Sequence, residues 1–259
     1  MNRIDPNNDG NVRNDVTNKM RKLLVSAPNL TDVDLCVPLN ANFCHALLNA
    51  CPKLRRLFAE YVEPLVKSER DTNLEPIEHA QIRRLLAQSK LSGIEAALDW
   101  FDNDVALLVA RAKTHPVQTL RIGVQSLSPP ALSAVFALPG LRYLELTTVP
   151  SAVPTELASD SIEELILGPC SRSKLADLFV PALNLPSLRR LSGHQPVRIN
   201  TVGWFFQLLH RSPQLERLQV AVNTQAQGAA CLLSVLLCSA DVIRDDANRL
   251  RTVDARRFL

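Results

Sequence analysis

The chain has few glycines, little excess charge of either sign and no long apolar run. Only 8 of its 259 residues are glycine, and the backbone loops that cradle phosphates depend on glycine. The formal net charge of +3 argues against a dedicated nucleic-acid binder, which needs a dominant basic surface. The most apolar stretch, Ala229–Ala240, has 12 residues, whereas a membrane helix needs roughly 20 apolar residues. We therefore expect a buried helix there and no membrane partner.

The six cysteines include no Cys-x-x-Cys pair. Structural zinc sites need cysteines or histidines in close pairs, so the sequence predicts no metal site. Buried, reduced thiols of a cytoplasmic or nuclear protein are the preferred interpretation.

Residues 1–22 are rich in asparagine and lack the apolar run of a secretory signal peptide. They predict a polar, flexible leader or an N-terminal cap. Asp5–Val12 matches the start of a calcium-binding loop, but Val16 occupies the position of the bidentate glutamate. A solvated leader is therefore preferred over a calcium site at Asp5–Gly10.

Sequence motifs of common enzymes are absent. The chain contains no phosphate-binding loop, nucleophile elbow, zinc-protease helix or dinucleotide-binding loop. Cys44 and His45 are adjacent, but neighbours on a helix point about 100° apart, so they do not form a nucleophile–base pair. We expect a protein without catalysis and without a cofactor.

Leucine is abundant, with 43 residues, and it recurs in a pattern. Five pentapeptides with a central proline end in leucine. In each case an apolar residue follows three places later and an apolar or small residue five places later. Four more blocks have this spacing without the proline. The nine blocks are Leu30/Val33/Leu35, Leu54/Leu57/Ala59, Leu91/Ile94/Ala96, Val117/Leu120/Ile122, Leu141/Leu144/Leu146, Ile162/Leu165/Leu167, Leu188/Leu191/Gly193, Leu215/Leu218/Val220 and Leu250/Val253/Ala255.

Each block predicts a short strand, because its second and third apolar positions alternate with polar residues. Proline lacks an N–H and restricts the residue before it, so it ends the preceding helix. The helices expected between the strands span 41–51, 78–88, 102–113 with Asp102 as N-cap, 129–138, 174–183, 201–209 and 226–238. Residues 147–160 contain two prolines and predict a return without a full helix. Trp100 and Trp204 lie in or beside these returns and are expected to be packing residues.

An α/β fold with parallel strands follows from this alternation. A doubly wound sheet is the alternative, but its strands favour valine and isoleucine and its turns contain glycine.

The blocks resemble irregular leucine-rich repeats of the ribonuclease-inhibitor-like kind, over about Leu30 to Ala255. They are most similar to the repeats in the substrate-receptor half of F-box proteins, although no F-box is recognisable here. Their mean spacing of about 27 residues lies within the range of roughly 20–29 residues for such repeats. The resemblance implies a solenoid of eight or nine irregular repeats over residues 23–259. A curved parallel sheet would lie inside it, and helices and irregular returns outside.

In such a solenoid, the residues beside each second apolar position lie on the concave strand face. Their charges alternate in sign, unlike the basic stripe that a phosphate backbone requires. Aromatic residues and arginine supply the strong contacts of protein interfaces. We expect Phe58, Tyr143 and Ile166 to be apolar or aromatic anchors among arginines and acidic residues, and we expect loss of Arg121 and Tyr143 to weaken partner binding. The predicted partner-binding residues are Asp32, Asp34, Arg56, Phe58, Thr119, Arg121, Tyr143, Glu145, Glu164, Ile166, Arg190, Arg217 and Gln219. The same rule places Gly93, Glu95, Ser192, Thr252 and Asp254 on this face.

These features predict a non-catalytic module that binds a protein partner. The resemblance implies a substrate-recognition adaptor of a ubiquitin ligase, with cullin-type ligase components as partners. A scaffold, an inhibitor or a structural subunit of a larger complex, including one that contains RNA, remains the alternative. An ordinary solvated strand face is the simplest alternative for the face itself. A basic patch at Arg83, Arg84 and Lys90 would favour RNA.

Overall fold

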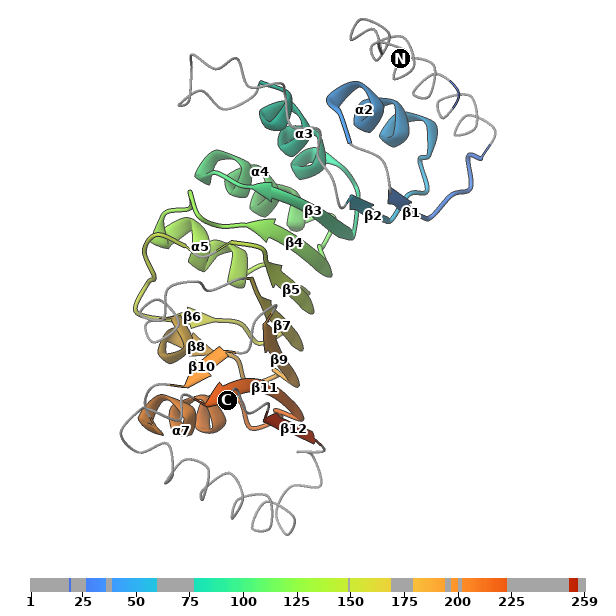
Figure 1. The fold of residues 1–259 in the computed structure, drawn as a ribbon. Helices are drawn as coiled ribbons and strands as arrows, with labels where there is room; N and C mark the ends of the chain where they lie inside the picture. Colours follow the sequence, from blue (N-terminus) through green and yellow to red (C-terminus); the bar gives the residue numbers. More distant parts are fainter. Residues whose placement is uncertain are drawn as a thin grey trace, which may run out of the picture. The chain divides into compact units, whose positions relative to one another are not determined.

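The computed structural model describes residues 19, 27–35, 39–59, 77–148, 150–168, 179–193, 197–199, 202–222 and 252–255. The leader predicted over 1–22 and the calcium-like segment thus lie outside the described residues, apart from Lys19. The chain has a mixed α/β fold whose paired strands are parallel (Figure 1). It divides into two compact units, residues 1–96 and 97–259, and we describe each unit by itself.

In the first unit, strands and helices alternate. The elements are β1 (Asp32–Leu35), α2 (Ala41–Ala50), β2 (Arg56–Ala59), α3 (Ile77–Gln88) and β3 (Gly93–Asp99), whose last three residues belong to the second unit. β2 pairs in parallel with β1 and with β3, so that Leu57 partners both Val33 and Ile94. The two helices lie on one side of these strands (Figure 1).

The second unit continues the alternation. Its elements are α4 (Asp102–Ala112), β4 (Thr119–Gly123), α5 (Pro129–Phe136), β5 (Tyr143–Leu146), β6 (Leu157–Ala158), β7 (Glu164–Leu167), β8 (Leu183–Asn184), β9 (Arg190–Gly193), β10 (Val197–Ile199), α7 (Val202–Arg211), β11 (Arg217–Val222) and β12 (Thr252–Ala255).

The strands of the second unit follow one another in the order β4, β5, β7, β9 and β11, and β10 and β12 both pair with β11. β6 and β8 form a separate parallel pair. The helices and the β6–β8 pair lie on one side of the strand row (Figure 1).

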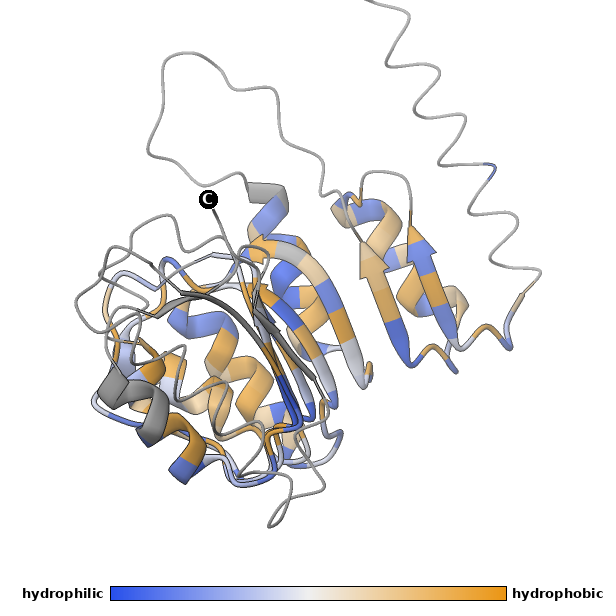
Figure 2. Cartoon of the chain, turned by 60° about the horizontal axis from the view of Figure 1, so that its bottom comes forward, coloured by the Kyte–Doolittle hydropathy of each residue, from blue (hydrophilic) through white to orange (hydrophobic). Residues whose placement is uncertain are grey.

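The second and third positions of all nine predicted blocks lie on strands. Within each unit, the second positions of neighbouring blocks are register partners. In the second unit the partners run from Leu120 through Leu144, Leu165, Leu191 and Leu218 to Val253. The five leucines of this row are at most 1% exposed, and each contributes about 2 kcal/mol by burial. Figure 2 shows the alternation of apolar and polar residues along the strands.

The proline pentapeptides form tight turns directly before the strands. In each, the N–H of the final leucine donates to the carbonyl oxygen three residues earlier; the donors are Leu30, Leu54, Leu141, Leu188 and Leu215, at 3.0–3.4 Å. Proline therefore occupies the second position of a β-turn, where its fixed φ is favourable. Gly140, at the third position of one turn, has a φ of 76°, which that turn needs and which glycine adopts readily.

A repeated backbone contact starts six of the strands: β2, β3, β5, β7, β9 and β11. The carbonyl oxygen of Arg142 accepts N–H groups from Glu163 and Glu164, at 2.8 and 2.9 Å. The same two-donor contact occurs at the carbonyl oxygens of Thr31, Arg55, Gln118, Glu163 and Arg189. Equivalent residues of successive blocks thus make equivalent hydrogen bonds within both units.

The helix predictions are confirmed to within two residues for α2, α3, α4, α5 and α7. Helix 226–238 lies outside the described residues, and of helix 174–183 only the end is described, where Leu183 begins β8. Residues 147–160 contain no helix in their described part, but they include the short strand β6.

One local prediction is wrong. Phe101, not Asp102, is the N-cap of α4. The Asp102 carboxylate instead accepts the backbone N–H of Ser128, at 3.0 Å. Hydrogen bonding from the Ser128 side chain and, to a lesser degree, from this N–H lowers the pKa of Asp102. The acidic side chain that bonds to the start of α4 is Asp104, whose carboxylate accepts the backbone N–H of Phe101. Trp100 is fully buried, which confirms it as a packing residue, whereas the side chain of Trp204 lies outside the description.

Candidate functional site on the uncovered strand face

In each unit, the strand face opposite the helices carries the residues that flank the buried leucine row. No described element lies over this side in either unit (Figure 1), and we call it the uncovered face. Alternation along a strand sends neighbouring side chains to opposite faces. The pattern that buries the leucines therefore also brings polar residues from strands far apart in sequence into one row.

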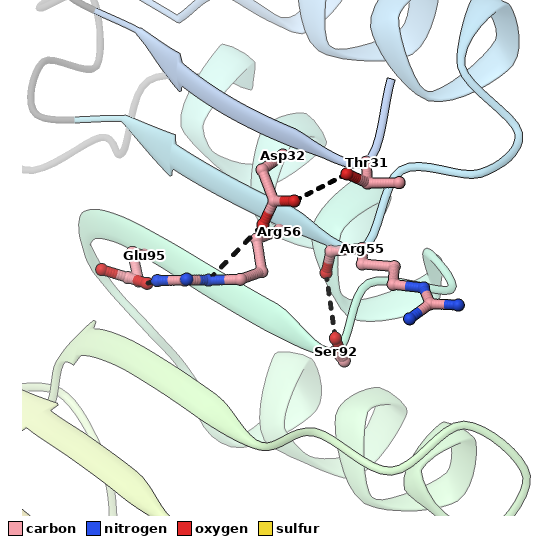
Figure 3. A network of polar contacts seen from close by, with 6 residues as sticks. All are labelled: Thr31, Asp32, Arg55, Arg56, Ser92 and Glu95. Carbon is pink, nitrogen blue, oxygen red and sulfur yellow. Dashed lines mark hydrogen bonds and ion pairs between the residues drawn. The ribbon is translucent and has the colours of Figure 1, made fainter. Parts of the chain in front are cut away.

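Arg56 is the centre of the uncovered face in the first unit. Its Nη2 lies 2.9 Å from Oε1 of Glu95, and its Nε lies 3.9 Å from Oδ1 of Asp32 (Figure 3). The hydrogen bond to Glu95 is the main cause that raises the pKa of the Arg56 guanidinium, and the charges of Glu95 and Asp32 add to it. Arg56 thus joins all three strands of this unit through side chains as well as backbone.

Gly93 makes room for this arrangement. It is the register partner of Arg56 on β3, and a Cβ built on Gly93 would lie 2.8 Å from Cγ of Arg56. A side chain at position 93 would collide with the aliphatic stem that crosses to Glu95.

Two further predicted residues of the first unit lie beside this network. Asp34 is exposed and Phe58 is half-buried, and they are register partners on β1 and β2. Phe58 in turn partners Glu95. The predicted aromatic anchor is therefore flanked by an acidic residue on each neighbouring strand.

Glu145 forms a nearly buried cluster in the second unit. Its Oε1 lies 2.8 Å from Nε of Arg121 on β4, and its Oε2 accepts a hydrogen bond of 2.8 Å from the Tyr143 hydroxyl. Glu145 is 6% exposed, and Arg121 and Tyr143 are half-buried. Two residues predicted to bind the partner are therefore engaged with a carboxylate of their own chain.

The remaining predicted residues of this unit are more open. Arg190 Nη2 lies 3.3 Å from Oε2 of Glu164 on the neighbouring strand. Arg217 on β11 is the register partner of Arg190 and is exposed. Thr119 and Ile166 are half-buried. Gln219 lies on β11, with its side chain outside the description.

A second row of charges was missed by the sequence prediction. It consists of the residue directly after the first position of the four successive blocks that begin at Leu141, Ile162, Leu188 and Leu215. Arg142 Nε lies 3.8 Å from Glu163 Oε1, and Arg189 Nη1 lies 3.8 Å from Glu216 Oε1. The signal was available, because charges of opposite sign alternate at this position in successive blocks. Exposed pairs of this kind stabilise a fold by at most about 1 kcal/mol each.

Cys44 and its neighbour His45 lie in different environments on α2. Cys44 is fully buried, while His45 is exposed, so the two side chains do not face each other. Burial raises the pKa of the Cys44 thiol to about 12. Cys44 and Cys51 are buried free thiols, as expected; the other four cysteines lie outside the described residues.

Within the described ranges, no group of three His, Cys, Asp or Glu side chains comes together as a metal site would require. Of the helices in the part of the chain that the structure describes, none has the length and apolar character to cross a bilayer.

Compared with models of known protein families and with curated proteins, the chain matches none.

Proposed function

We propose that the chain is a leucine-rich-repeat solenoid whose uncovered strand face binds a protein partner without catalysis. One observation carries the proposal. Within each unit, successive blocks pair in parallel at the same position, and their strands begin with the same two-donor backbone contact. Stacked supersecondary units that bury their apolar rows only against neighbours are typical of solenoid proteins. Such proteins bind partners on the extended face that the stacking creates.

The chemistry of the uncovered face favours a protein over a nucleic acid. Arginines on this face form ion pairs with glutamates of neighbouring strands. A phosphate backbone would be repelled by each glutamate in turn. Half-buried Phe58, Tyr143 and Ile166 provide the apolar contacts that are enriched at protein interfaces.

The three basic residues that would favour RNA, Arg83, Arg84 and Lys90, do not all lie on the surface. Arg83 is 3% exposed and so faces the interior of the first unit, although Arg84 and Lys90 are exposed. Two separate surface cations do not form the clustered basic surface that RNA recognition requires.

The resemblance of the blocks to F-box receptors favours a substrate-recognition adaptor of a ubiquitin ligase as the first candidate. A cytoplasmic or nuclear location belongs to the same proposal, since two described cysteines are buried, reduced thiols.

Site-specific photo-crosslinking in cells tests the binding face. A photoreactive phenylalanine analogue is placed at Ile166, on the uncovered face, and separately at Ala106, which is exposed on α4. We expect a defined protein adduct from position 166 and none of the same mass from position 106. Mass spectrometry of the adducts then identifies the partner.

The outcomes discriminate between the candidates. Cullin-type ligase components co-purifying with the 166 adduct would support the adaptor. A stable adduct without them would leave a scaffold or structural subunit. Adducts only from position 106, or RNA as the principal crosslinked species, would contradict the proposed function. Both variants must show the circular dichroism and melting temperature of the unmodified chain.

A further inference from the structure

We propose that Arg190 and Arg217 together bind an acidic side chain of the protein partner. The inference rests on the proposed function and adds the chemistry of what is recognised. It locates the polar anchor at β9 and β11, away from the Arg121–Glu145 cluster that the sequence favoured.

The two arginines are held side by side. Arg190 and Arg217 are register partners on adjacent parallel strands, which lie about 4.8 Å apart. Both are exposed on the uncovered face. Like charges directly opposite each other in a sheet are unfavourable, so this pair destabilises the unbound chain unless an anion comes between them.

The described carboxylates around the two arginines contact Arg190 and Arg189 but not Arg217. Glu164 contacts Arg190 from β7, and Glu216 contacts Arg189. Among the residues that the structure describes, no carboxylate lies within ion-pair distance of Arg217. A carboxylate from outside the chain would therefore give Arg217 the kind of ion pair that Arg56, Arg121 and Arg190 already have on this face.

The neighbourhood favours an acidic protein segment over a polyphosphate. A guanidinium binds a carboxylate with two parallel hydrogen bonds, and two adjacent guanidinia hold it from both sides. Glu164 and Glu216 flank the pair and would repel a continuous phosphate backbone. Half-buried Ile166, on the strand before Arg190, offers an apolar contact that a peptide uses and a phosphate chain does not.

Fluorescence anisotropy with a defined probe tests the inference. The probe is a fluorescein-labelled peptide of alternating glutamate and serine, with a glutamine–serine peptide as its counterpart and labelled poly(U) RNA as a second arm. The full chain is expected to bind the glutamate peptide in preference to both. Arg217→Gln and Arg190→Gln should each weaken that binding by about tenfold, and rising salt should weaken it in the unsubstituted chain.

Arg142→Gln is the matched control. Arg142 is also an exposed arginine at the start of a strand in this unit, but it already has Glu163 as a partner. The Arg142→Gln substitution removes one positive charge, as Arg217→Gln does, and should change the affinity for the glutamate peptide by less than about twofold. Equal losses for Arg142→Gln and Arg217→Gln would mean attraction by net charge alone and would overturn the inference.

The remaining outcomes separate this inference from the proposed function. No binding of the glutamate peptide, or tighter binding of poly(U) that depends on Arg217, would overturn the acidic-segment site. If the glutamate peptide does not bind but position 166 still crosslinks a partner, the proposed function stands and only the arginine anchor is wrong. If the 166 adduct is also missing, both fail.

Discussion

The arginine–carboxylate contacts of the uncovered face differ in burial, and burial decides what each contributes. Arg56 is 57% exposed on its side chain, so its pairs are screened by water and stabilise the fold only slightly. Glu145 is 6% exposed, and a charge removed from water to that extent needs its partners. A binding partner can therefore replace the contacts of Arg56 at little cost in free energy. The contact of Glu145 with Arg121, in contrast, is needed for the folding of its unit.

Arg121→Ala should therefore destabilise the chain by about 3 kcal/mol, since it withdraws the guanidinium from a nearly buried carboxylate. The free energy of unfolding from urea denaturation measures the effect. Arg217→Ala is the control, because Arg217 is exposed, and it should change the free energy of unfolding by less than about 0.5 kcal/mol in either direction. Equal midpoints for the two variants would show that the Glu145 cluster is not structural.

The structural role of the Glu145 cluster limits which arginines can be substituted to test partner binding. Arg121 and Tyr143 are the residues that sequence reasoning would replace first, yet both contact Glu145. A loss of binding in such variants would confound recognition with folding. Arg190 and Arg217 separate the two, because they are exposed.

At the scale of the element, each strand has one face that must be apolar because it is buried and one face that tolerates polar residues because it reaches solvent. On β5, Leu144 is fully buried between Leu120 and Leu165, its register partners on the neighbouring strands. On β7, Ile166 is half-buried on the uncovered face. The same chemical change should therefore have different results at these two positions.

Leu144→Asp is expected to abolish cooperative unfolding of the chain, because it buries a carboxylate without a partner. Ile166→Asp should leave a folded protein, since the carboxylate there reaches solvent. Thermal melts followed by circular dichroism distinguish the two. A cooperatively folded Leu144→Asp chain would mean that this strand face is not the core.

The turns show how a short motif acts on an element. In each pentapeptide, proline sets the second turn position and the following leucine begins the block. Both effects are local, because they depend on the proline ring and on residues within three positions. The start of five strands could therefore be predicted closely, whereas Asp102 was assigned as a cap by residue type alone and instead bonds Ser128 across 26 residues.

At the scale of the whole molecule, the accessibility of a buried thiol reports the folded state of the first unit. Cys44 is fully buried in α2, and its pKa is raised to about 12. The neutral thiol is thus favoured by folding, so this contribution to stability is full below the unfolded pKa near 8.5. It is lost progressively as pH rises above that value.

We expect Cys44 to resist alkylation by iodoacetamide at pH 8 until the unit unfolds, since the thiolate is the reactive form. Peptide mapping by mass spectrometry after a labelling pulse measures the modified fraction at residue 44. Its rise with urea should follow the unfolding transition. Rapid labelling of Cys44 without denaturant would contradict the packing of α2 against the strands.

The sequence by itself determined most of the described elements of this protein: the leucine spacing, the prolines and the alternation on each strand were enough to place nine strands and the helices α2, α3, α4, α5 and α7. These features act over a few residues, where backbone geometry alone links pattern to structure. The tertiary structure decided which charges meet. Arg56 reaches Glu95 over 39 positions because Gly93 leaves space, and Glu145 and Arg83 are buried despite their charge. Such outcomes depend on register between strands and on the room around each side chain, which no local pattern contains.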